Sequence, residues 1–310
     1  MRLKSNLLLL TMPLFVSVPA IAQDSLIPEL YGRININAEI MKPDSGDSES
    51  DIVSNASRLG VRGSKEISPG LELIYQIEYE VDPADGDISG QSFKQRNSFL
   101  GFEGAYGTIL VGKHDTPLKE TQNRIDLFND MIGDIKNVVD GENRVNDIIL
   151  YESPEYSGFH ASLATIAGGQ DSDFTSSISA SVTYENELFY AALGLDSDVE
   201  NRDVVRFVSQ LYLGNLTLGA LYQESEKTQV PGADKEDGTF VSAAYKANKF
   251  TWKAQYGVSD EKAPGKEQLT AGFDYSLGDN TKLFTYITTF AADNSALEND
   301  HYGVGFEHRF

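Results

Sequence analysis

The chain contains repeated stretches of about ten residues in which apolar and polar side chains alternate. In the last of them, residues 301–310, every second position is apolar or aromatic up to the terminal Phe310, and the positions between are small or charged. Successive side chains of a strand point to opposite faces, so each stretch has one apolar and one polar face. A tilted strand needs about 9–11 residues to cross a bilayer, and the pattern therefore predicts transmembrane strands.

We expect an all-β fold, a transmembrane antiparallel β-barrel of sixteen strands. Tight turns alternate with longer acidic loops between the strands, which is typical of outer-membrane barrels with short turns on one rim. An even number of strands brings both chain ends to that rim. The predicted strands are 28–40, 56–66, 71–81, 93–104, 108–114, 147–153, 159–168, 176–185, 188–196, 204–214, 216–225, 238–246, 249–258, 267–277, 281–290 and 301–310.

One connection, residues 115–146, has no clear strand pattern over its roughly thirty residues. Connections longer than ~12–15 residues without secondary structure are usually functional or disordered, and this one is apolar enough to pack. Asp126, Asp130 and Asp134 recur at every fourth position, which would put them on one face of a helix. A loop of this length can fold into the barrel and narrow its lumen.

The beginning of the chain has the three parts of a secretory signal peptide. Two basic residues precede an apolar run at residues 7–18, and Ala20 and Ala22 satisfy the rule for small residues at the cleavage site. The apolar run is shorter than the ~20 residues that a membrane-spanning helix needs. We therefore predict a signal peptide at residues 1–22 and a barrel at residues 23–310.

The composition narrows the possible functions. The formal net charge is −22, so nucleic acid would be repelled rather than bound. The chain has no cysteine, which excludes thiolate metal sites and cysteine nucleophiles. We expect neither a metal nor a cofactor. The acidic total favours cations over anions as permeating ions.

His160 and Ser162 lie two residues apart on one predicted strand and are the strongest candidates for catalysis. A hydrolase with such a pair needs a third residue that orients the histidine, and its nucleophile must reach lipid. Phe159, Ala161 and Leu163 take the outward parity of this strand, so His160 and Ser162 would face the lumen. We therefore expect a protein that is not an enzyme.

Motifs along the whole mature length resemble those of Gram-negative general porins. The resemblance implies a homotrimeric barrel in the outer membrane that passes small hydrophilic solutes by diffusion. It also implies contact with lipopolysaccharide and membrane lipid, and recognition of the terminal Phe310 by the barrel-assembly machinery. A substrate-specific outer-membrane channel is the alternative. The motifs are Tyr31-Gly-Arg33, Ser57-Arg-Leu-Gly-Val-Arg-Gly63, Tyr75-Gln-Ile-Glu-Tyr79, Arg96-Asn-Ser-Phe-Leu-Gly-Phe102, Gly112-Lys-His114, Asn143-Arg144 and Tyr151-Glu-Ser-Pro-Glu-Tyr-Ser-Gly-Phe159.

The same resemblance implies a third loop in the lumen whose acids face a row of arginines. Arg58 and Arg96 match that row, and Arg144 matches the arginine that follows the loop. Alternation puts Arg58, Arg62 and Arg96 in the lumen, since an arginine facing lipid at the midplane costs ~2–4 kcal/mol. Charges within the Debye length of ~8 Å outweigh distant loops, so these arginines can reverse the expected cation preference. The predicted pore constriction consists of Arg58, Arg62, Arg96, Arg144, Asp126, Asp130 and Asp134.

Two polar residues of the fourth predicted strand, Gln95 and Asn97, share the parity of Phe99. A polar side chain that faces lipid is costly, and a contact between protomers would remove that cost. We therefore predict that the first five strands and the last one form the contact between the subunits of the trimer.

Overall fold

The computed structural model describes residues 28–167 and 176–310, so the predicted signal peptide lies outside the described residues. Its strands form a single antiparallel sheet. They are β1 (Glu29–Pro43), β2 (Glu49–Ser54), β3 (Arg58–Ser68), β4 (Leu71–Glu80), β5 (Lys94–Gly104), β6 (Gly107–Asp115), β7 (Arg144–Glu152), β8 (Phe159–Ile166), β9 (Ser177–Glu185), β10 (Phe189–Val199), β11 (Arg202–Leu213), β12 (Leu216–Lys227), β13 (Glu236–Ala247), β14 (Phe250–Ser259), β15 (Lys266–Ser276), β16 (Thr281–Ala291) and β17 (Asn299–Arg309).

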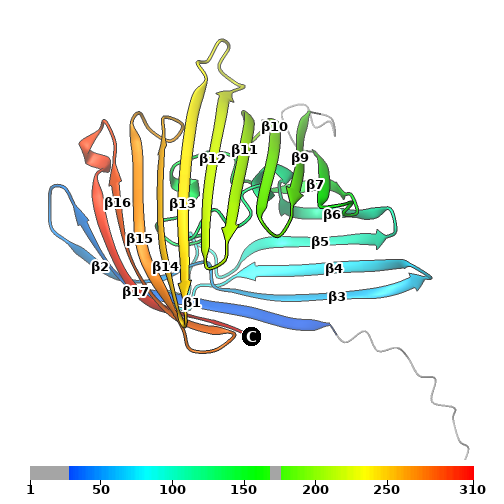
Figure 1. Ribbon diagram of the computed structural model, residues 1–310, viewed down its shortest axis with the longest axis horizontal. Helices are drawn as coiled ribbons and strands as arrows, with labels where there is room; N and C mark the ends of the chain where they lie inside the picture. Colours follow the sequence, from blue (N-terminus) through cyan, green and yellow to red (C-terminus); the bar gives the residue numbers. More distant parts are fainter. Residues whose placement is uncertain (1–27, 168–175) are drawn as a thin grey trace, which may run out of the picture.

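The sheet closes on itself because β1 pairs with β17 (Figure 1). The last residue continues this pairing, since the Phe310 N–H donates to the Gly32 carbonyl at 3.1 Å and the Gly32 N–H donates back at 2.9 Å. The Phe310 ring lies over Gly32, where a Cβ would come within 2.4 Å of its Cζ atom. β2 and β3 pair with successive parts of β1, so together they count as one strand of the barrel. The seventeen segments therefore form a sixteen-strand barrel. This confirms the predicted fold.

The second predicted strand, 56–66, is longer than expected and is interrupted. It begins at Glu49 and breaks between β2 and β3, where Ala56 has a φ of +47° that no strand residue adopts. At the break, the side-chain amide of Asn55 donates to the side-chain oxygens of Asn35 at 3.1 Å and Asn37 at 2.6 Å. These hydrogen bonds inside the barrel replace the missing ladder bonds, and the break leaves backbone carbonyls free for other donors.

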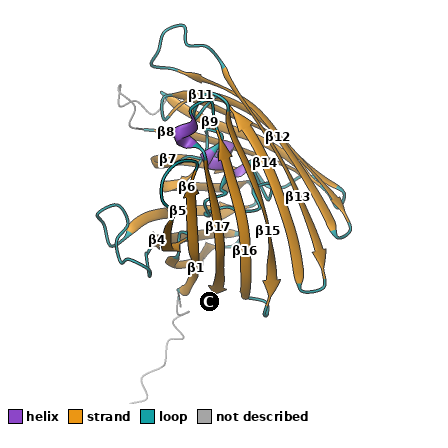
Figure 2. Cartoon of the chain, turned by 90° about the vertical axis from the view of Figure 1, so that its left-hand side faces the viewer, coloured by secondary structure: helices purple, strands orange, loops and turns teal. Residues whose placement is uncertain are grey.

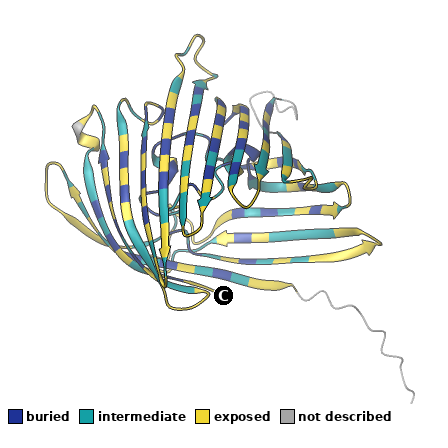
Figure 3. Cartoon of the chain, in the orientation of Figure 1, coloured by how far each residue is buried: buried dark blue, intermediate teal, exposed yellow. Residues whose placement is uncertain are grey.

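Exposed and buried residues alternate along the strands, as the banding in Figure 3 shows. On β11, Val208 is fully buried whereas its neighbour Phe207 is 47% exposed. Large apolar side chains on the outer face suit a barrel wall in contact with lipid. No helix in the described residues is long and apolar enough to cross a membrane.

The alternation fails at one point on β5. The register shifts between the pairs Ile77–Ser98 and Tyr79–Gln95, which marks a bulge. A bulge re-aims side chains, and here Asn97 accepts a hydrogen bond from Arg144 inside the barrel at 2.6 Å. The expectation that Asn97 faces lipid was therefore wrong, and it no longer supports the predicted subunit contact.

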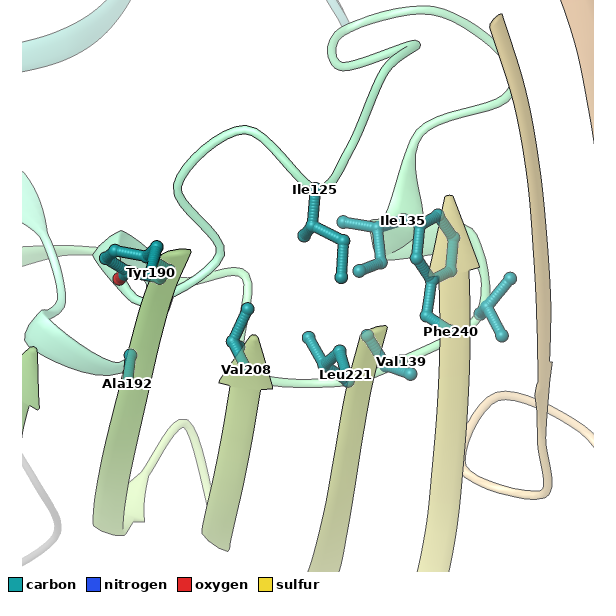
Figure 4. Packing of buried hydrophobic residues seen from close by; sticks show 9 residues of the cluster. Ile125, Ile135, Val139, Tyr190, Ala192, Val208, Leu221 and Phe240 are labelled. Atoms are coloured by element: carbon teal, nitrogen blue, oxygen red, sulfur yellow. The ribbon is translucent and has the colours of Figure 1, made fainter. Parts of the chain in front are cut away.

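The long connection, residues 116–143 and called the loop below, contains the short helix α1 (Pro117–Glu120) and the 3₁₀ turn η1 (Ile135–Asn137). A second 3₁₀ turn, η2 (Ser295–Leu297), lies in the last connection. The helical turns of the loop lie behind the strands of the wall in Figure 2. Buried apolar residues of the loop pack against inward-facing residues of β10 to β13 (Figure 4). This cluster contains Ile125, Ile135, Val138, Val139, Tyr190, Ala192, Val208, Leu221 and Phe240.

Candidate functional site: a charged neck

Three arginines from neighbouring strands converge inside the barrel, Arg33 on β1, Arg58 on β3 and Arg96 on β5. Arg33 and Arg58 are direct cross-strand neighbours. Like charges at such a position destabilise a sheet, so the pair needs a shared anion. The strand break helps to hold both side chains, because Arg33 donates to the Asn55 carbonyl at 2.9 Å and Arg58 donates to the Ala56 carbonyl at 3.2 Å.

Asp130 of the loop supplies the shared anion. Its Oδ2 atom accepts hydrogen bonds from Arg33 at 2.6 Å and from Arg58 at 2.5 Å, and its Oδ1 atom lies 3.9 Å from Arg96. Asp130 has a φ of +68°, a left-handed conformation that aspartate tolerates better than most residues. The four residues Arg33, Arg58, Arg96 and Asp130 are called the neck below.

The electrostatics of the neck keep Asp130 ionised. Burial opposes its charge, but Arg58, Arg33 and Arg96 together outweigh burial and hold the pKa of Asp130 well below its usual range. A nearby positive charge stabilises a carboxylate in this way. Asp130 is therefore negative at neutral pH.

Two acids of β4 surround the same arginines from the other side. Glu78 accepts from Arg96 at 2.8 Å and from the Tyr31 hydroxyl at 3.0 Å, and Glu80 accepts from Arg96 at 3.2 Å. Arg96 is almost fully buried, and a buried guanidinium needs such partners. Arg96 is thus more firmly fixed than Arg58, which is 18% exposed in its side chain.

Within the described residues, the other two predicted acids form no ion pair with an arginine. Asp134 caps η1 by accepting from the Lys136 N–H at 2.8 Å, and it also accepts from the Asp130 N–H at 2.8 Å. Asp126 accepts from the N–H groups of Phe128 and Ile135, each at 3.1 Å. Aspartates that bind nearby backbone N–H groups favour turns over helix. The segment is a series of turns rather than a helix, so the three acids do not share one face.

Arg144 lies at the root of the loop, where it pairs with Asp115 at 3.1 Å. Asp115 also binds Lys119 of α1 at 2.9 Å. This cluster and three of the neck residues, Arg58, Arg96 and Asp130, line one space of about 220 Å³ inside the barrel. The side chains that line it are Arg58, Arg96, Asn97, Asp115, Lys119, Glu120, Gln122, Asn129, Asp130, Asp134, Lys136, Glu142 and Arg144.

Arg62 stands apart from the other predicted arginines. It pairs with Glu29 at 2.8 Å, stacks over the Tyr31 ring and is half exposed. It lies four residues along β3 from Arg58, which is roughly 13 Å at the rise of a strand. Sequence reasoning missed Arg33 and Glu78, although both stand at polar positions of alternating strands, which was the available signal.

Three comparisons place this architecture among known proteins. The Delftia acidovorans "Outer membrane porin protein 32" is 27% identical, over 91% of this chain and 88% of that protein. The solved structure of the "Anion-selective porin from Comamonas acidovorans" aligns over 91% of this chain and 99% of its own, with a TM-score of 0.77 and 23% identity. The trimer form of Vibrio cholerae OmpT aligns over 91% and 99%, with a TM-score of 0.66 and 14% identity.

A family model described as "Gram-negative porin" matches residues 9–295, which is nearly the entire chain. The closed antiparallel barrel, its apolar outer face and its charged interior are what that family requires. The chain therefore belongs to the Gram-negative porin family, whose members are proteins of the outer membrane.

Proposed function

We propose that the protein is a diffusion channel for small hydrophilic solutes and ions, and that the neck is its narrowest point. The observation that carries this proposal is the juxtaposition of Asp130 on the loop with Arg33 and Arg58 on the wall. Opposed charges across a narrow passage create a transverse field that orients dipolar solutes. The channel moves solutes down their gradients, so it needs no catalytic group.

Ion preference depends on the balance of charge beside this passage. Five cationic and five acidic side chains line the space around the neck, so their formal charges cancel. The acidic loops then favour cations, whereas similarity to the anion-selective porin of Comamonas acidovorans favours anions. We propose a modest cation preference above neutral pH, set by the loops because the charges that line the space beside the neck nearly cancel.

This preference should change sign with pH because of Glu120 in α1. Desolvation by the surrounding protein, together with the nearby Asp115, raises the pKa of Glu120 to about 7, although its side chain keeps contact with water. When the pH falls below about 7, Glu120 becomes neutral, and the lining is left with a positive balance.

The test is the reversal potential of single channels in a salt gradient at about pH 8 and about pH 5. We expect cation preference at the higher pH and anion preference at the lower, with the shift strongly reduced in Glu120→Gln. Reversal potentials that do not move with pH would contradict the role of Glu120. A large ohmic current supports the diffusion channel, and saturation by one solute would favour a substrate-specific channel instead.

We also propose that the protein forms a homotrimer, which the trimer form of Vibrio cholerae OmpT supports. Lipopolysaccharide around the barrel and the barrel-assembly machinery, acting on Phe310, are the further partners that family membership favours. The Phe310 ring packed over Gly32 at the closing seam is compatible with a role in assembly. A deletion of Phe310 that still assembles at the normal rate would contradict that role.

A further inference from the structure

The outer wall has a shallow groove on β13 to β16. Three alanines, Ala243, Ala254 and Ala271, are paired side by side across β13, β14 and β15. The residues on the inner face of these strands, such as Lys253 and Gln255, are buried, so the alanines point outward. The row of methyl groups forms the floor of a groove of about 470 Å³.

Large side chains flank this floor on both sides. One flanking row contains Tyr245, Trp252 and Phe273, which lie two residues from the alanines on each strand. The Trp252 and Phe273 rings are 5.0 Å apart, and Trp252 is 51% exposed. The two flanking rows lie four residues apart, about 13 Å along the strands. Because their side chains fill part of that distance, the floor is about as wide as a single hydrocarbon chain needs. The opposite row contains Val241, Tyr256 and Leu269.

A polar anchor lies beside the groove, toward the short-turn rim and on the far side of the row that contains Trp252 and Phe273. Beyond Trp252 and Phe273 the next outward pair is Phe250 and Tyr275, whose rings are 4.9 Å apart. The ammonium group of Lys249, in the turn between β13 and β14, lies 6.0 Å from the centre of the Tyr275 ring. Along the strands, toward the short-turn rim, the apolar groove, an aromatic belt and a cation follow one another in the order of the acyl chain, interface and phosphate of a lipid.

We propose that this groove binds one acyl chain of an anionic phospholipid of the inner leaflet, with Lys249 beside the lipid phosphate. The inner leaflet follows from membership of the outer-membrane family, because short turns lie on the periplasmic rim. The groove runs across strands that tilt by about 45° in a bilayer, so the bound chain leans by a similar angle. The wall of β1 and β17, where the trimer contact is expected, begins at the strand next to the groove, which ends on β16.

Trp252 makes the proposal directly testable, because it is the only tryptophan in the chain. The protein is reconstituted in phosphatidylcholine vesicles that contain increasing fractions of phosphatidylglycerol with brominated acyl chains, which quench tryptophan fluorescence on contact. We expect quenching to saturate, with an affinity about fivefold higher than for brominated phosphatidylcholine, as one lysine near the membrane surface would give.

Variants separate the groove from general lipid contact. Filling the floor with Ala254→Leu and Ala271→Leu should abolish saturable quenching, whereas Ala191→Leu, an outward alanine on β10, should leave it unchanged. Lys249→Gln should remove the preference for the anionic lipid and keep the quenching. Equal quenching curves for the two lipids in the wild-type protein would overturn the proposal. Absence of quenching would also overturn it, since another protein surface would then cover the groove.

Discussion

The loop touches two sides of the barrel, and the two contacts differ in water access. On the β1–β3–β5 side the neck residues Arg33 and Asp130 each retain 13% exposure of their side chains. On the β10–β13 side Ile125 and Ile135 are fully buried, and the ion pair of Glu142 with Arg206 is 2.6 Å long with the arginine at 0% exposure. Charges open to water can act on a passing solute, while sealed ones can only hold the loop in place.

The acids on the two sides also have opposite electrostatics. Three arginines overcome burial at Asp130 and lower its pKa. Burial dominates at Glu142 and at Glu261, the latter in the turn after β14, and it raises the pKa of both. The loop therefore has one contact that stays charged as pH falls and another that becomes neutral. We expect the open side to act in permeation and the sealed side to anchor the loop.

The largest effect is expected from Arg206→Met on the sealed side. Arg206 binds Glu142, Gln223 and the Asp140 carbonyl at 2.6–2.7 Å. Its removal leaves Glu142 buried without a cation, which typically costs about 3–5 kcal/mol. We expect a lower midpoint of thermal unfolding. We also expect larger fluctuations of the single-channel current, because the loop detaches from this wall.

A double variant and an exposed pair provide the controls for Arg206→Met. Adding Glu142→Gln should recover much of the lost stability, since it removes the unpaired charge. Arg62→Met breaks an exposed pair with Glu29, which we expect to contribute only ~0–1 kcal/mol. A similar loss of stability in Arg62→Met and Arg206→Met would show that the two contacts are equivalent.

The barrel itself could be predicted from the sequence because the period of two is imposed on every strand by lipid on one side and water on the other. The predicted ends of β4, β5 and β14 agree with the structure to within about one residue. The alternation of apolar and polar residues does not predict side-chain direction where the backbone departs from a regular strand. The break at Ala56 and the bulge before Asn97 decide which side chains reach the neck.

The site could be predicted only in part for the same reason. Arg58 and Arg96 were predicted because they match the arginine row of the porin family and because an arginine on a membrane strand must face the lumen. Asp130 was one of three equivalent candidates by spacing, and only the turns of the loop distinguish it from Asp126 and Asp134. Sequence spacing does not reveal which aspartate binds backbone N–H groups and which one remains free for Arg33.

A smaller effect, confined to permeation, is expected from Asp130→Asn on the open side. The change leaves three arginines at the neck without their shared anion. We expect the permeability ratio of anions to cations to rise about tenfold, which corresponds to ~1.4 kcal/mol. Asp47→Asn removes the same charge from an exposed outer loop and should change the reversal potential little. An equal shift in both variants would mean that total charge, rather than the neck, sets ion preference.

The smallest effect concerns the pH dependence of the sealed side. Glu261 holds the end of the loop by accepting from the Asp140 N–H at 2.6 Å, and burial raises the pKa of Glu261 to about 7. A carboxyl group whose pKa is raised in the folded state binds more protons there than when unfolded. Its contribution is therefore full below about pH 4.5 and is lost as the pH rises through about 7.

Wild-type protein should accordingly unfold at a lower temperature at about pH 8 than at about pH 5. The free energy of unfolding should be lower at about pH 8 by at most about 3 kcal/mol. Glu261→Gln keeps the shape of the side chain and has no charge to bury, so this part of the pH dependence should disappear. Glu187→Gln, in an exposed turn, is the matched control and should behave as the wild type does. If Glu261→Gln retains the full pH dependence, the sealed side owes its pH response to Glu142 or other acids, and Glu261 acts only as a hydrogen-bond acceptor.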